Sequence, residues 1–352
     1  MNTSTRPPLY TLHDADPRQH QEIVLSIWRG NLQHELGGHE AKYQWFYLSG
    51  PDGPPLLQLM RHEPSGDWVG ACAAGRRRML CRGQEIRAGV IVDFAVLPEH
   101  RSLGPALTLQ GGLMAAGARE LDLLYGFPNP KAVAAIKRGG YEKLTDIVGY
   151  ARVLRHGRYL ARHMPAWLAN GMGAVIDTAI WAWDGLRRLL SPKVRTEWSD
   201  HADVRMDKLW EASERGEGLL MVRDAAYARW RFDEAPHGVT RYLFVEDQTE
   251  GVPLAWFATR SDSDVLRVRD FWSKQGTRGV SRACIDALLW AARATGHVAV
   301  TTEIAGPQAS LAGWRACGFF ERERRPVYGR WSGAKDASGC TDLYLTSADK
   351  DG

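Results

Sequence analysis

The sequence predicts a layered α+β fold of the α/β class, in which two copies of one domain follow each other along the chain. Three observations lead to this prediction: a strand–turn–helix segment near residue 92, strands and helices in mixed order on both sides of it, and short motifs that recur in the second half. With 352 residues, the chain is long enough for one or two domains that each bury a substantial core.

The strand–turn–helix segment spans residues 92–106. Apolar residues alternate with small or polar ones from Val92 to Val96, as in a half-buried strand, and Pro98 ends that strand. Pro105 suits the first position of a helix, where no amide hydrogen is missed, and the apolar pattern continues the helix to about Arg119. The turn between them predicts an anion site, because unpaired amides and the positive end of the helix dipole point into it.

This turn resembles motif A of the GNAT acetyltransferase superfamily, an Arg/Gln-x-x-Gly-x-Gly/Ala loop that follows a strand. It stands here as Arg101-Ser102-Leu103-Gly104-Pro105-Ala106. The resemblance implies acetyl-CoA, or another acyl-CoA, as co-substrate, with its pyrophosphate on the loop amides and its pantetheine arm paired with the preceding strand. It assigns co-substrate binding to Val96 and Leu97 through their backbone, and to Arg101, Ser102, Leu103, Gly104 and Ala106.

A second resemblance lies further along the chain. In the same superfamily an Asn after the fifth strand precedes a helix and then a Gly-Phe/Tyr step, and Asn129 to Gly140-Tyr141 follows that layout. The resemblance therefore covers residues 85–150 well and residues 5–85 loosely. It implies that Asn129 binds the pantetheine arm or a bridging water. Capping of the next helix by Asn129 is an equal alternative.

The first copy is expected to contain strands and helices in a mixed order. The strand segments are short and rich in apolar residues, and the helices carry apolar residues on one face. In chain order we expect a strand at 9–12, a helix capped by Asp14 or Asp16 that begins near Pro17, strands near 56–61, 68–77 and 84–97, the helix after motif A, a buried strand at 123–127, a helix from Asn129 to Arg138 that Gly139-Gly140 stops, and a strand near 147–154.

Self-similarity at a nearly constant spacing indicates that the chain is a repeat. Asp93-Phe94 recurs as Asp270-Phe271, which is 177 positions later. Further pairs are Arg101 with Arg278, Ala106 with Ala283, Asn129-Pro130 with Gly306-Pro307, Gly140-Tyr141 with Gly318-Phe319, and Tyr43–Tyr47 with Tyr227–Phe232. Together with the resemblance, the repeat predicts two GNAT-like domains, each with a mixed, mostly antiparallel central sheet flanked by helices.

The second copy differs from the first at two positions that the resemblance assigns to co-substrate binding. Ser281 stands at the position of Gly104, and Gly306 at the position of Asn129. A Cβ at the tightest point of the loop obstructs the close approach of a phosphate, which glycine permits. We therefore predict an intact acyl-CoA domain at 1–155, a helical linker at 156–198, and a degenerate GNAT-like domain at 199–352.

The linker contains an apolar stretch at residues 164–190. Its polar residues His163, Asn170, Asp177 and Asp184 recur every seven positions and so form one narrow stripe on a helix. The polar breaks argue against a transmembrane span. Packing between the domains, a membrane-surface contact and a dimer contact all remain open for this helix.

Acyl transfer to an amine needs a neutral nucleophile and a path for its proton. Asp93 is a candidate base, since enzymes of the superfamily often place an acidic residue on this strand. Its recurrence as Asp270 in the degenerate copy favours a structural role instead. Many relatives carry a Tyr general acid four residues before the Gly-Phe/Tyr step, where this chain has Ile136. Tyr125 and Tyr141 are the nearby substitutes, with a buried aromatic as the alternative role for each, and Tyr125 is the catalytic candidate.

Composition excludes several other functions. The formal net charge is +4, with Lys and Arg interspersed among Asp and Glu, so we expect neither nucleic-acid binding nor a basic groove. The five cysteines lack C-x-x-C spacing, which predicts neither a zinc cluster nor a disulfide framework and suits a reducing compartment. No metal site is expected. The beginning of the sequence shows no apolar signal segment, so we expect a cytoplasmic protein, with peripheral contact to the inner face of the membrane as the alternative.

These observations predict an acyltransferase that moves an acetyl or other acyl group from acyl-CoA to an amine. The resemblance favours a small-molecule acceptor such as an amino sugar or a precursor of surface polysaccharide. One alternative is a FemABX-like transferase that uses aminoacyl-tRNA, against which the intact Arg101–Ala106 loop and the expected lack of a basic groove argue. The other is a non-catalytic binding or scaffold protein with the same fold.

Overall fold

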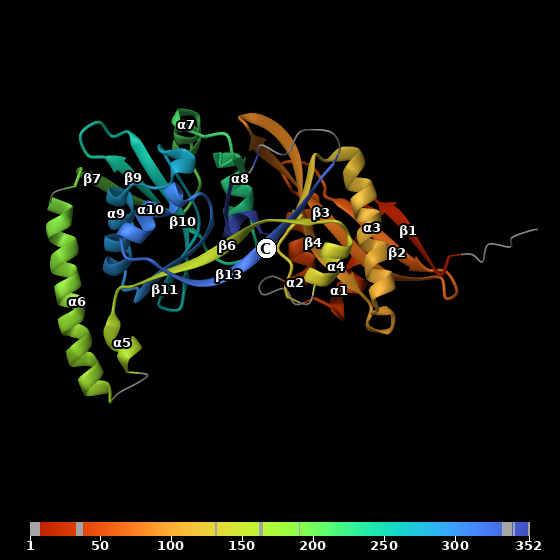
Figure 1. The fold of residues 1–352 in the computed structure, drawn as a ribbon, viewed down its shortest axis with the longest axis horizontal. Coiled ribbons are helices and arrows are strands. Elements are labelled where there is room, and N and C mark those ends of the chain that lie inside the picture. The colour runs from red at the N-terminus through yellow and green to blue at the C-terminus, as the bar shows by residue number, and fades with distance from the viewer. Residues whose placement is uncertain are drawn as a thin grey trace, which may run out of the picture.

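The computed structural model describes residues 8–32, 38–130, 132–161, 165–189, 191–332, 340 and 342–350. The fold class predicted from the sequence is confirmed: a mixed sheet is flanked by helices (Figure 1). The strands join in one 14-stranded sheet with the order β1-β2-β3-β4-β5-β13-β6-β12-β11-β10-β9-β7, and β8 and β14 lie off this path.

The strands of the first half match the predicted positions within a few residues. They are β1 (Tyr10–Ala15), β2 (Leu56–His62), β3 (Asp67–Cys81), β4 (Gln84–Val96), β5 (Leu123–Gly126) and β6 (Glu142–Val153). Those of the second half are β7 (Val194–Ser199), β8 (Leu219–Met221), β9 (Arg241–Asp247), β10 (Pro253–Asp262), β11 (Val265–Ser273), β12 (Ala299–Ala305), β13 (Phe320–Trp331) and β14 (Leu343–Thr346). Helices connect the strands in a similar order in the two halves.

The helices include α1 (Gln21–Arg29), α2 (Gly38–Lys42), α3 (Leu103–Glu120), α4 (Val133–Arg138), α7 (Arg205–Ala212), α8 (Ala225–Ala228), α9 (Arg282–Ala294) and α10 (Gln308–Ala316). Helix α3 begins two residues before Pro105, where the sequence analysis placed its start. Helix α4 is shorter than predicted: it begins at Val133, and ahead of it the Ala132 amide bonds to the Asn129 carbonyl at 3.0 Å. Short 3-10 turns, η2 (Pro98–His100) and η4 (Gly276–Arg278), precede α3 and α9.

Two π-helical segments, η1 (Tyr43–Leu48) and η3 (Arg229–Asp233), face each other between the halves. The Trp45 indole donates to the Trp230 carbonyl at 2.7 Å, and the Trp230 indole donates to the Trp45 carbonyl at 3.2 Å. The rings stack with their centroids 5.1 Å apart. Such a reciprocal contact between two corresponding segments supports the interpretation of the chain as a repeat, which stays a prediction.

One strand of each half, β6 or β13, pairs with a strand of the other half. β13 pairs with β5, with Tyr328 opposite Gly126, and β6 pairs with β12, with Val148 opposite Ile304. These two strands also pair with each other, and they cross the middle of the molecule (Figure 1). The halves therefore share one hydrogen-bonded sheet, although the sequence analysis treats residue 155 as a boundary between domains.

The linker forms α5 (His156–Leu160) and α6 (Ala166–Leu189), while residues 164 and 190, which bound the predicted apolar stretch, lie outside the described part of the chain. Helix α6 stands at the edge of the molecule (Figure 1). Two residues of its polar stripe face inward: Asp177 accepts from His156 at 2.6 Å, and Asp184 lies 3.5 Å from Arg152. His163 and the Asn170 side chain lie outside the described part of the chain. Large apolar side chains such as Trp167 face solvent instead, 75% exposed. A membrane-surface or dimer contact through this face stays a prediction.

No helix in the described ranges is long and apolar enough to cross a membrane. The expectation that the cysteines form no disulfide is wrong, because Cys81 at the end of β3 is joined to Cys340. This bond links positions 259 residues apart, and it ties the segment that leads into β14 to the first half. Sequence spacing gave no sign of it, since the fold alone brings these two cysteines together.

Candidate functional site

A cavity of about 1330 Å³ lies between the two halves. Its first-half wall consists of Val92–Phe94 on β4, residues 126–129 after β5, and Gln110 and Leu113 of α3. Its second-half wall includes His237, residues of β10, β11, β12 and β13, and the C-terminal segment around Lys350. The exchanged strand β6 contributes Gly149, Tyr150, Ala151 and Val153 to the lining. This cavity is large enough for a ligand of ordinary cofactor size.

A bulge in β4 opens the first-half wall. Asp93 has a φ of 50°, a left-handed conformation that Asp and Asn tolerate better than most residues. The register with β3 shifts here, since Val92 faces Ala73 while Ala95 faces Ala71. The bulge bends β4, and the parallel pairing with β5 ends at Val90. A gap between β4 and β5 follows, lined by the residues of the bulge.

Asp93 is buried at this bulge with both carboxylate oxygens engaged. Lys42 Nζ lies 2.6 Å from one oxygen, and the Tyr47 hydroxyl donates to the other at 3.0 Å. Burial and the Asp93 charge raise the pKa of Tyr47 well above its ordinary value, so this hydroxyl stays protonated. The geometry shows the structural role that the recurrence of Asp270 favoured, and a role of Asp93 as base stays a prediction.

The Arg101–Ala106 turn lies beside the cavity rather than in its wall. Arg101 Nε donates to the Val96 carbonyl at 3.1 Å, and its guanidinium also bonds the Asn31 side chain. Ser102 is the N-cap of α3 without a side-chain hydrogen bond to the helix. A β-carbon at Gly104 would meet no heavy atom within 4 Å outside its own helical turn, so the space above this glycine is open.

The backbone positions predicted to pair with a pantetheine arm lie at the end of β4. The Leu97 amide donates to Val69 at 2.8 Å, which directs it toward β3. Because successive residues of a strand direct their backbone groups to opposite edges, the Val96 amide faces the open edge. Its carbonyl, on the same edge, accepts from Arg101. Val96 is thus the better placed of the two residues, while Leu97 pairs within the sheet.

Tyr125 does not reach the cavity. Its side chain is 1% exposed, and its hydroxyl donates to the Asp349 carbonyl at 3.1 Å. Burial raises the pKa of this phenol far above its ordinary value, which makes it a poor proton donor at neutral pH. Tyr141 is also buried, and burial raises the pKa of its hydroxyl as well. This placement gives no support to Tyr125 as general acid.

Asn129 does line the cavity, next to Ile136. Its side-chain oxygen accepts from the Ala132 amide at 3.0 Å, which is a bond within the turn ahead of α4. The N-cap of α4 is Ala132, and no side chain caps this helix, so both roles predicted for Asn129 stay predictions. Ile136 also lines the cavity, and its apolar side chain offers no hydroxyl group at this place.

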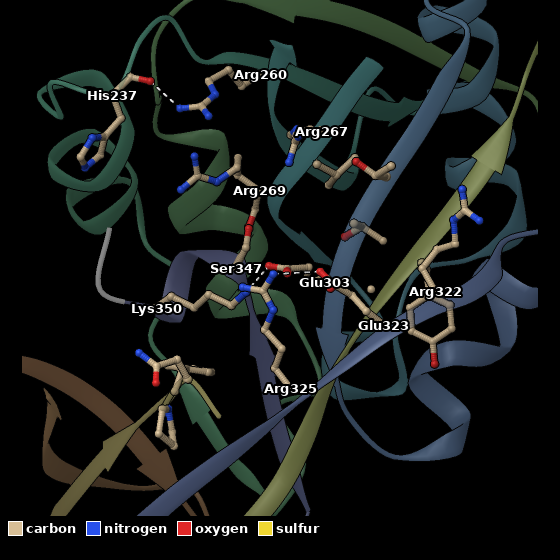
Figure 2. A pocket seen from close by; sticks show the side chains of 18 of the residues that line it. His237, Arg260, Arg267, Arg269, Glu303, Arg322, Glu323, Arg325, Ser347 and Lys350 are labelled. Atoms are coloured by element: carbon tan, nitrogen blue, oxygen red, sulfur yellow. Dashed lines mark hydrogen bonds and ion pairs between the residues drawn. The ribbon is translucent and has the colours of Figure 1, made fainter. Parts of the chain in front are cut away.

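The second-half wall carries residues that the sequence analysis missed. Arg260, Arg267 and Arg269 lie on neighbouring strands β10 and β11, and their guanidinium groups gather on one side of the cavity (Figure 2). The expectation of no basic groove is therefore wrong, because sheet pairing gathers arginines that are spaced apart in the sequence. The alternation Arg267-Val268-Arg269 was the available signal, since residues two apart share one face of a strand.

His237 lies near these arginines and stays neutral. Burial, and then the charges of Arg231 and Arg269, lower the pKa of its imidazole to about 3. Its Nε2 atom is buried without a hydrogen-bond partner among the residues that the structure describes. The imidazole ring packs edge-on against Trp45, with the ring centroids 4.9 Å apart, so its buried nitrogen belongs to the packing beside the cavity.

The gap of the second half, between β11 and β12, is filled by the chain itself. β14 pairs with β12, with Thr346 opposite Ile304, and the Thr346 hydroxyl donates to Asp270 at 2.8 Å. The Ser347 hydroxyl donates to the Arg269 carbonyl at 2.8 Å. The segment around Thr346 thus occupies, beside β11, the place that corresponds to the open gap beside β4.

Solved structures with a similar fold are acyltransferases by name. No family model matches the chain, and no curated protein matches it. A probable N-acyltransferase from Enterococcus faecalis V583, described as a conserved protein of unknown function, aligns with a TM-score of 0.62 at 11% identity, over 92% of this chain and 73% of its own. A GCN5-related N-acetyltransferase from Anabaena variabilis ATCC 29413 aligns with a TM-score of 0.62 at 12% identity. The alignment covers 92% of this chain and 73% of the acetyltransferase. N-myristoyltransferase from Saccharomyces cerevisiae with bound myristoyl-CoA aligns with a TM-score of 0.53 at 10% identity. The alignment covers 93% of this chain and 84% of the myristoyltransferase. At this identity the likeness establishes the fold.

Proposed function

We propose that the protein is a GNAT-type N-acyltransferase that moves an acetyl or other acyl group from acyl-CoA to an amine. The observation that carries this proposal is the open gap between β4 and β5, which begins at the Asp93 bulge and leads into the cavity. A gap between two parallel strands exposes backbone groups to which an extended amide-containing arm can bond. The likeness to a fold that holds myristoyl-CoA in one neighbour supports this use of the gap.

The phosphates of the co-substrate are proposed to bind at the Arg101–Ala106 turn. The first turn of an α-helix leaves its amides unpaired, and α3 starts at Leu103 without a side-chain cap from Ser102. The open space at Gly104 admits a phosphate close to the backbone. Arg101 braces the end of β4 and adds positive charge to the site. An acyl chain longer than acetyl would extend into the cavity.

In the proposed reaction the neutral amine attacks the thioester carbonyl, and the CoA thiolate leaves. Asp93 is the proposed base, as the carboxylate of the first-half wall. Each of its oxygens accepts one hydrogen bond, from Lys42 or from Tyr47, and keeps a further lone pair that can take the amine proton. We propose an amino sugar or a related polysaccharide precursor as acceptor, which a turnover screen over amines tests; exclusive use of a non-sugar amine would contradict it.

Calorimetric titration of acetyl-CoA tests the site. We expect the wild type to bind one acetyl-CoA per chain, because only the first-half gap is open. Arg101→Ala should lose about 1.5–3 kcal/mol of binding free energy, the range for a hydrogen bond to a charged group. Arg278→Ala, the matched change in the second half, should bind as the wild type does.

Three results would contradict this proposal in different ways. Absence of binding to the wild type would remove acyl-CoA as co-substrate. Two molecules bound per chain would mean that the second gap also serves. Equal losses in Arg101→Ala and Arg278→Ala would mean that the motif A turn is not the phosphate site.

A further inference from the structure

We propose that the second-half wall of the cavity binds an anionic group of the acceptor, a carboxylate or a phosphate, with Arg269 as its anchor. This inference rests on the proposed acyl transfer, and it adds the chemical class of the acceptor. The acyl-CoA gap lies at the first-half wall, so the opposite wall is the part of the same cavity that is left for the acceptor. The residues of that wall decide which acceptors fit.

Arg269 is held by its backbone and is free at its side chain. Its carbonyl accepts from the Ser347 hydroxyl at 2.8 Å, which fixes its position on β11. Its guanidinium lines the cavity and pairs with no carboxylate in the described part of the chain. Burial and the charges of Arg231 and Arg260 lower the pKa of Arg269 to about 10, so the group is charged at neutral pH and poorly compensated.

The neighbours of Arg269 reinforce its charge. Arg260 is fixed in place by a bond from its Nη1 to the His237 carbonyl at 2.5 Å and has no carboxylate partner among the described residues. Arg267 pairs with Asp262 at 2.6 Å, and both of these side chains are about half exposed. Figure 2 shows the three guanidinium groups on the same side of the cavity.

Three carboxylates that line the cavity pair with cations outside this cluster. Glu303 is bonded by Lys350, and Glu323 lies 2.9 Å from Arg325. Asp93 at the opposite wall is paired with Lys42. Two guanidinium groups close together in a partly buried place repel each other, and a shared anion would relieve that repulsion.

The shape of the donors fits an oxyanion. A guanidinium offers parallel N–H donors that match the oxygens of a carboxylate or a phosphate. His237 contributes through its backbone, because its carbonyl accepts from Arg260 and holds that guanidinium at the wall (Figure 2). An acceptor with an amine at one end and an anionic group at the other would span the cavity from the acyl group to Arg269. Acidic amino acids, sugar phosphates and nucleotide-linked sugars share this chemistry.

Titration with two anions distinguishes a phosphate group of the acceptor from a carboxylate group. Inorganic phosphate and succinate are titrated separately into the full-length protein, with binding followed by calorimetry. We expect the wild type to bind at least one of them, and the preferred one identifies a phosphate or a carboxylate acceptor. Arg269→Gln should weaken that binding about tenfold or more, as for the loss of a hydrogen bond to a charged group. Arg241→Gln, which changes an exposed arginine paired with Asp200, is the matched control and should change nothing.

Acetyl-CoA titrations with the same variants separate this inference from the proposed function. Arg269→Gln should bind acetyl-CoA as the wild type does, with an unchanged melting temperature as evidence of folding. If Arg269→Gln loses acetyl-CoA and anion affinity together, the wall holds the CoA phosphates and the acceptor assignment is overturned. If neither anion binds, or if Arg269→Gln and Arg241→Gln bind it equally, the anion site is overturned while acetyl-CoA binding still stands. If acetyl-CoA fails to bind the wild type but an anion binds at Arg269, the acyl transfer proposal falls and the anion site remains.

Discussion

The two halves of the molecule build the same gap and use it differently. In each half a strand with an Asp three residues before its end, β4 or β11, pairs in parallel with the next strand and then parts from it. Beside β4 the gap opens into the cavity. Beside β11 it is filled by β14 and by η6 (Ser347–Asp349), which bond to Asp270 and to the Arg269 carbonyl. Whether such a gap binds a ligand or becomes core therefore depends on which segment of chain lies in it.

The turns that follow β4 and β11 also differ: the first is open, and the second is packed and capped by the protein. In the first turn Gly104 faces open space, and Ser102 makes no side-chain cap. In the second turn Ser281 caps α9 by accepting from the Cys284 amide. Gly279 there has a φ of 97°, and a β-carbon on it would lie 2.4 Å from the Ser310 carbonyl. Packing within the protein thus explains the glycine of the second turn, whereas no described residue outside its own helical turn crowds the glycine of the first.

The largest expected effect comes from removing the buried cation beside the filled gap. Arg223 lies 3.0 Å from Asp270 and 2.8 Å from Asp349, and all three side chains are fully buried. Arg223→Met would leave two buried carboxylates without their cation, so we expect a loss of about 3–5 kcal/mol in the free energy of unfolding. Urea denaturation measures this loss.

Lys42→Met is the matched change in the first half, because it removes the cation from Asp93. Since Asp93 keeps the Tyr47 hydroxyl and lies next to the cavity, we expect a smaller loss than for Arg223→Met. Equal losses would mean that the open gap is as much a part of the core as the filled one.

The second effect concerns the two corresponding aspartates and separates catalysis from stability. If Asp93 is the base, Asp93→Asn should lower kcat about 100-fold, the low end for general acid–base catalysis, with the acetyl-CoA affinity unchanged. Asp270→Asn, in the filled gap, should lower the free energy of unfolding and leave kcat of the folded fraction as it was. Steady-state turnover with the best amine of the screen, together with urea denaturation of each variant, measures both quantities. Full turnover in Asp93→Asn would leave Asp93 with the purely structural role that its contacts with Lys42 and Tyr47 show.

Local patterns in the sequence were enough to predict most strands and helices of the first half. Alternating apolar residues identified β4, and two prolines identified the turn and the start of α3 to within two residues. These features depend on neighbours in the chain, which is why a single sequence shows them. The open gap at Asp93 was not predicted as such, because a bulge depends on the register with β3.

Features that depend on distant parts of the chain could not be predicted. The exchange of β6 and β13, the Cys81–Cys340 bond and the C-terminal plug of the second gap all join residues far apart in the sequence. The arginine cluster of the second-half wall likewise arises from pairing between β10 and β11. For Tyr125, proximity in sequence to the motif suggested a catalytic role, but the strand directs its hydroxyl to Asp349 in the core.

The smallest effect sharpens the comparison of the turns. Gly104 and Gly111 both lie in α3, and a β-carbon at either position would meet no heavy atom within 4 Å outside its own helical turn. Alanine at either position should raise the free energy of unfolding by up to about 1 kcal/mol, since glycine is unfavourable in a helix. Only Gly104→Ala should weaken acetyl-CoA binding, by about 1 kcal/mol or roughly fivefold, because its methyl group would hold a phosphate away from the loop amides. Calorimetry on the two variants measures this difference. Equal affinities would mean that the space above Gly104 is open for a reason other than the co-substrate, and the first turn would then differ from the second in packing alone.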